Sequence, residues 1–90
     1  METRRIVDHL EELAEKLGIE VIHESLAGED FPVRSGICKV KGRYRILLDR
    51  SETAEDKMRV LARALACFNT EGVYLLPQIR GILEQVRRSQ

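Results

Sequence analysis

The chain has 90 residues, of which 43% are hydrophobic and 33% are charged, and its formal net charge is zero. This length predicts a single folded domain spanning residues 1–90, and the composition excludes a disordered chain. The apolar runs are too short to cross a bilayer, so we expect no membrane partner. The first residues lead into an amphipathic pattern rather than an apolar signal-peptide core, so the expected location is the cytoplasm.

Charge is unevenly distributed along the chain despite the neutral total. Residues 1–33 carry nine acidic and three basic side chains, whereas residues 34–50 carry six basic side chains and one acidic one. A basic segment beside an acidic one favours an anionic partner, or else the two segments complement each other within the fold.

The first predicted element is an amphipathic helix that Gly18 ends, because glycine readily adopts the left-handed conformation of a helix C-terminal cap. Its apolar stripe consists of Ile6, Leu10, Leu13, Ala14 and Leu17. Residues 19–24 predict a strand with Ile19, Val21 and His23 on one face. Residues 27–35 contain glycine, proline and aspartate and predict a loop.

Residues 36–49 predict a β-hairpin around Gly42, and two registers compete. A two-residue turn pairs Val40 with Arg43, which mixes polarity on both faces. A three-residue loop, residues 41–43, instead pairs Val40 with Tyr44 and Cys38 with Ile46. We expect the three-residue loop because it gives one coherent core face, with the Cys38 thiol directed into the core.

Two further helices follow the hairpin. Thr53 and Asp56 form a capping pattern for the first of them. The buried stripe of that helix is predicted to consist of Met58, Leu61, Leu65 and Phe68. Pro77 suits the start of the last helix, whose apolar side is Ile79, Ile82, Leu83 and Val86. The predicted fold class is therefore α+β in the order α-β-β-β-α-α, with a small three-stranded antiparallel or mixed sheet packed on helices.

The segment from Gly36 to about Phe68 resembles the minimal core of zincin-like metallopeptidases, in particular the small ImmA/IrrE type. In that family a leading helix and a short sheet precede a helix of the form Leu-Ala-His-Glu-Leu-x-His. This chain retains Leu61-Ala62, but the two histidine positions fall on Arg63 and Cys67 and the glutamate position falls on Ala64. The resemblance implies a zincin-like fold over roughly residues 1–70.

The substituted motif predicts that the chain is not an enzyme. Zinc hydrolysis needs two imidazoles at i and i+4 and a carboxylate general base at i+1. Arg63 is a permanent cation that repels Zn²⁺, Ala64 accepts no proton, and Cys67 alone is one ligand. We therefore expect no catalytic residue, metal or cofactor. The resemblance implies a catalytically inactive module for protein interaction or regulation, with Arg63, Ala64 and Cys67 lining a vestigial cleft between helix and sheet.

The basic hairpin at residues 39–45 provides an alternative function, the binding of nucleic acid or another anionic partner. Its candidate residues are Lys39, Lys41, Arg43 and Arg45. Single-stranded nucleic acid is usually held by basic residues together with exposed aromatic rings, and here only Tyr44 is aromatic. The same side chains also serve as guards on an exposed strand edge. A third, enzymatic alternative is thiol chemistry at Cys67, whose thiolate the adjacent Arg63 favours.

The tail from Tyr74 to Gln90 carries many apolar groups for a chain of this size. Part of this surface is expected to dock a protein partner or a second copy, so the sequence predicts partner binding or self-association.

Overall fold

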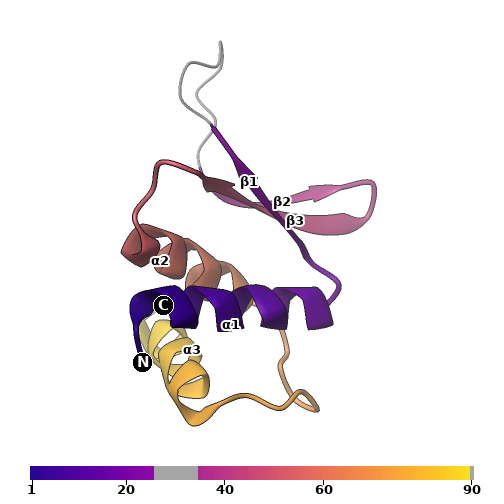
Figure 1. The fold of residues 1–90 in the computed structure, drawn as a ribbon. Coiled ribbons are helices and arrows are strands. Elements are labelled where there is room, and N and C mark those ends of the chain that lie inside the picture. The colour runs from indigo at the N-terminus through magenta and orange to yellow at the C-terminus, as the bar shows by residue number, and fades with distance from the viewer. Residues whose placement is uncertain (26–34, 90) are drawn as a thin grey trace.

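The computed structural model describes residues 1–25 and 35–89, so the predicted loop at residues 27–35 lies outside the described residues except for Ser35. The elements follow the predicted order of one helix, three strands and two helices (Figure 1). They are α1 (Thr3–Lys16), β1 (Glu20–Glu24), β2 (Gly36–Val40), β3 (Arg43–Asp49), α2 (Ala54–Leu65) and α3 (Pro77–Ser89).

Helix α1 is amphipathic and ends as the sequence predicts. Its buried residues recur at helical spacing and are Val7, Leu10, Leu13 and Ala14. Gly18 adopts a φ of 78°, and the Ile19 amide then donates to the Ala14 carbonyl over 2.8 Å. This left-handed residue turns the chain out of the helix and into β1.

The sheet is mixed, with the strand order β1-β3-β2. Strand β1 runs parallel to β3 and places Val21 beside Ile46 and His23 beside Leu48. Strand β2 runs antiparallel to β3 as a hairpin. The central strand β3 therefore supplies the fully buried Ile46 and Leu48, while both of its neighbours are edge strands.

The predicted hairpin register is wrong. The turn has two residues, Lys41 and Gly42, and the pairs are Val40 with Arg43, Lys39 with Tyr44 and Cys38 with Arg45. Lys41 and Gly42 both adopt positive φ, 51° and 80°, which is the turn geometry whose twist matches that of two antiparallel strands. The twist requirement outweighs the gain of a uniformly apolar face, so Cys38 lies on the face opposite Ile46 rather than in the core.

Helices α2 and α3 begin at the predicted positions. The Thr53 hydroxyl accepts a hydrogen bond from the Asp56 amide over 3.1 Å, and Glu55 and Asp56 lie at the positive end of the helix dipole. Pro77 is the first residue of α3, where its missing N–H costs nothing.

All three helices lie on one side of the sheet (Figure 1). Helix α2 contacts α1, α3, β2 and β3, so it occupies the centre of the helical layer. The largest fully buried side chains come from both layers and are Leu10, Ile46, Leu48, Leu61, Leu65 and Leu83. None of the described helices is long and apolar enough to cross a membrane.

Candidate functional site

The three residues expected to line a vestigial cleft lie at the end of α2 and just after it, and their environments differ. Ala64 is buried in the core, whereas Arg63 and Cys67 are exposed one turn apart. The Cys67 thiol donates weakly to the Arg63 carbonyl over 3.5 Å, the usual contact of a small polar side chain with the preceding helical turn. Arg63 borders a concave surface.

That surface is a groove of about 640 Å³ between α2 and α3. It is lined by Met58, Arg59, Ala62, Arg63, Ile82, Gln85, Val86 and Ser89. Its apolar part comes from both helices, because Met58 and Ala62 face Ile82 and Val86 across it. The groove beside Arg63 is thus formed with α3, whereas the resemblance implies a cleft between the helix and the sheet.

The charges on the groove are of one sign. Arg59 and Arg63 lie four residues apart and therefore one turn apart along α2. Arg59 makes an exposed contact of 3.7 Å between its Nη1 atom and Oδ1 of Asp56, which contributes little to stability. Arg63 forms no ion pair within residues 1–25 and 35–89. Gln85 and Ser89 on α3 are neutral, so the rim of the groove is positive.

The basic residues of the hairpin are distributed over both faces of the sheet. Lys39 lies on the helix side with its amine 5.1 Å from the centre of the Tyr44 ring. That ring also contacts Phe68 edge-to-face at 5.0 Å between centroids. Arg43 and Arg45 lie on the opposite face, and the Arg45 Nε atom is 3.4 Å from a carboxylate oxygen of Glu20. Lys41 lies in the turn, so the four cations do not converge on one surface.

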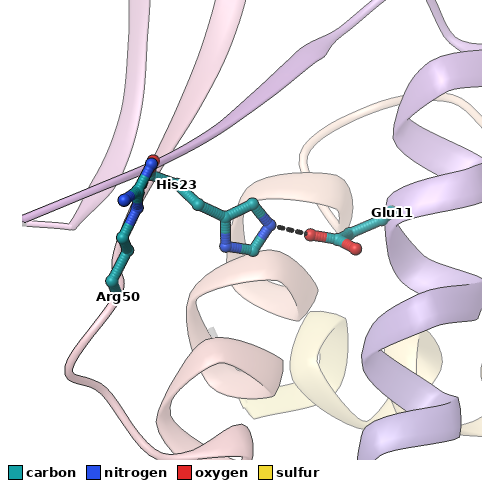
Figure 2. Close-up of polar contacts among 3 residues, drawn as sticks. All are labelled: Glu11, His23 and Arg50. Atoms are coloured by element: carbon teal, nitrogen blue, oxygen red, sulfur yellow. Dashed lines mark hydrogen bonds and ion pairs between the residues drawn. The ribbon is translucent and has the colours of Figure 1, made fainter.

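A polar contact that the sequence analysis missed joins the sheet to α1 (Figure 2). The His23 ring nitrogen Nε2 contacts the Glu11 carboxylate, and the Arg50 Nε atom donates to the His23 carbonyl over 3.1 Å. Glu11 and His23 lie on different elements and form no motif spacing, so no sequence signal could have paired them. In the described part of the chain, no three histidine, cysteine, aspartate or glutamate side chains are placed to hold a metal ion.

The tail is more buried than its composition suggests. Leu75, Ile79 and Leu83 belong to the core, and Tyr74 is the strongly exposed apolar residue, with 74% of its surface accessible. The apolar surface that α3 leaves partly accessible comes from Ile82 and Val86, which line the groove.

The α2–α3 groove is therefore the surface best suited to binding, because it combines apolar side chains from two helices with a cation that forms no ion pair with a described residue. In the Glu11–His23 contact, in contrast, the imidazole and the carboxylate already pair with each other. Comparisons of the chain with models of protein families, with curated proteins and with solved structures find no match in any of the three.

Proposed function

We propose that this protein is a catalytically inactive, zincin-like interaction module that binds an acidic amphipathic helix of a protein partner in the α2–α3 groove. The observation that carries the proposal is the groove itself, with its apolar lining and its two arginines on one rim.

One feature supports the zincin-like part of the proposal, and a second supports the absence of catalysis. The order of one helix, three strands and a helix matches the order that the resemblance implies. Arg63, Ala64 and Cys67 stand at the positions of the metal ligands and the general base, and neither an arginine nor an alanine can replace those groups.

The shape and the charge of the groove define the class of partner. Grooves between two helices recognise helical peptides through apolar side chains at i, i+3, i+4 and i+7. Met58, Ala62, Ile82 and Val86 provide the apolar contacts. Arg59 and Arg63 are separated by one turn, about 6 Å along the helix axis, so a partner helix with glutamates at i and i+4 presents carboxylates at the matching spacing.

The hairpin provides less support for the alternative of nucleic-acid binding. The Lys39 amine lies over the Tyr44 ring, and Arg45 pairs with Glu20. These two cations lie on opposite faces of the sheet. A surface that follows a phosphate backbone needs its cations in one groove or stripe. Binding of RNA or DNA with a steep salt dependence would favour this alternative over the groove.

The binding test uses two synthetic helical peptides with the same apolar stripe, one carrying glutamates and the other lysines on the flanking positions. We expect calorimetry to detect binding of the acidic peptide only. The Arg63→Glu substitution should weaken this binding at least about tenfold, because it replaces an attractive contact with a repulsive one at a partly desolvated site.

Arg80 is a matched control, since it is exposed on α3 but does not line the groove. Arg80→Glu makes the same change in net charge and should alter the affinity by less than about twofold. Equal effects of the two substitutions, or equal binding of both peptides, would refute the groove as the site.

The absence of metal chemistry is tested separately by measuring the zinc content of the purified, dialysed protein. We expect far less than one equivalent. Stoichiometric zinc that is lost in Cys67→Ala would contradict the proposal, because it would make Cys67 a ligand of a resident metal.

A further inference from the structure

The face of the sheet that points away from the three helices carries apolar side chains from all three strands. The register places Ile22 of β1 beside Leu47 of β3, while Cys38 and Val40 of β2 complete the same face. Ile22, Cys38 and Leu47 are partly accessible, and 40% of the Val40 surface is exposed. We call this surface the outer sheet face. No helix of the described chain covers it (Figure 1).

The charges on the outer sheet face are separated along the strand direction. In the middle, Arg45 and Glu20 neutralise each other across β3 and β1. Glu24 lies at the end of β1 beside Asp49, and Arg43 lies at the other end, next to the hairpin turn. The two ends lie six residue steps apart along β3, which corresponds to about 20 Å. Glu24 and Arg43 are exposed, and neither forms an ion pair with a described residue.

This charge pattern is complementary to the same pattern on a second copy of the chain. A twofold axis that lies between two stacked sheets and perpendicular to their strands reverses the strand direction. It therefore brings the acidic end of one copy, Glu24 and the neighbouring Asp49, toward Arg43 of the other, twice in each dimer. The apolar side chains of the two faces, together with the Glu20–Arg45 pairs beside them, then meet at the spacing of about 10 Å that is usual for packed sheets. From this complementarity we propose that the outer sheet face is the interface of a homodimer, in which two sheets stack between two helical layers.

The homodimer does not depend on the proposed function. The α2–α3 groove belongs to the helical layer and shares no residue with the outer sheet face, so it stays accessible when two sheets stack. A failure of one proposal leaves the other intact, because peptide binding and self-association are measured separately.

Sedimentation equilibrium from about 1 µM to about 500 µM tests the proposal, because a homodimer forms by mass action. We expect a concentration-dependent shift from monomer to dimer that weakens as salt screens the exposed charges. Leu47→Lys should leave the far-ultraviolet circular dichroism unchanged and abolish the dimer. A protein that stays monomeric at low salt over the whole range would overturn the proposal.

Charge reversal identifies the interface. Glu24→Arg and Arg43→Glu each turn two attractive contacts per dimer into repulsive ones, so each alone should raise the dissociation constant about tenfold or more. The double variant restores both contacts in the opposite sense and should bind more tightly than either single variant, while the unchanged Asp49 beside position 24 keeps it weaker than the unmodified protein. If the loss of dimerisation free energy in the double variant equals the sum of the losses in the two single variants, this pairing is refuted.

The two free cysteines provide an internal comparison in the unmodified chain. Cys38 lies on the outer sheet face, whereas Cys67 is exposed in the turn that follows α2. With a slow thiol reagent, labelling of Cys38 should slow as the protein concentration rises, while labelling of Cys67 stays constant. If labelling slows at both cysteines, or at neither, any association involves a surface other than the outer sheet face.

Discussion

The α2–α3 groove and the outer sheet face both expose apolar side chains, but their charge patterns differ. The α2–α3 groove carries charge of one sign, from Arg59 and Arg63. The outer sheet face carries both signs, with Glu24 and Arg43 at opposite ends. A surface of one sign repels a second copy of itself and attracts an acidic partner, whereas a surface with separated signs complements itself under a twofold rotation. The sign pattern, more than the apolar area, therefore distinguishes partner binding from self-association.

The largest effect that we predict is a difference in stability loss between truncations in the core and truncations on these two surfaces. Leu48→Ala and Leu83→Ala remove fully buried side chains and should each lower the free energy of unfolding by about 2–5 kcal/mol. Their sequence neighbours Leu47 and Ile82 lie on the outer sheet face and in the groove, so the same truncation there should cost about 1 kcal/mol or less. Urea unfolding at low protein concentration measures all four variants. Equal losses within a pair would show that the surface residue belongs to the core.

The next effect concerns the turn that decides which side chains reach the outer sheet face. Gly42 has a φ of 80°, so Gly42→Ala should destabilise the protein by about 1–2 kcal/mol. Gly81 is helical, and an added Cβ there meets no atom within 4 Å. Gly81→Ala should therefore stabilise the protein by about 0.5–1 kcal/mol. Thermal unfolding of both variants measures the contrast, and a harmless Gly42→Ala would argue against the two-residue turn.

The smallest effect that we predict is a difference in coupling free energy between the polar contacts of the two sheet faces. Glu11 and His23 lie between the sheet and α1, with 28% and 39% of their side chains accessible, whereas Glu20 and Arg45 are 61% and 42% accessible on the outer face. Double-mutant cycles should give a coupling of up to about 1 kcal/mol for the first pair and about 0.2–0.5 kcal/mol for the second. A larger coupling for the second pair would show that the outer sheet face is better shielded from solvent than the fold indicates.

The helices were predictable from the sequence because their signals are local. The apolar stripe of α1, the turn at Gly18 and the Thr53–Asp56 cap each depend on residues within one or two turns. The structure confirms the turn and the cap, and it buries Leu10, Leu13 and Ala14 of the predicted stripe, with Val7 in place of Ile6. The mixed sheet was one of two predicted alternatives, because nothing local decides that β1 pairs with β3 instead of β2.

The hairpin register was mispredicted for a physical reason. The prediction weighed the polarity of side chains such as Val40 and Tyr44, but the backbone twist selected a turn in which Lys41 itself adopts positive φ. This shift of one residue exchanged the faces of β2 and moved Cys38 from the expected core to the outer sheet face.

The candidate site was predictable only in part. Arg63 was singled out by its place in a motif, but Ile82 and Val86 of α3 were expected to be only the apolar side of a helix. These two residues line one groove with Met58 and Ala62 because of the way α2 and α3 pack after the linker between them. No residue spacing in the sequence encodes that packing.

The most direct test of the difference between the two surfaces is a nuclear magnetic resonance titration. Uniformly ¹⁵N-labelled protein at a fixed, low concentration receives the acidic amphipathic peptide. The account predicts that amide shifts concentrate around Arg59, Arg63, Ile82 and Val86, while those of Ile22, Cys38 and Leu47 remain unchanged. Shifts centred on the three strands, with the α2–α3 groove unaffected, would contradict it.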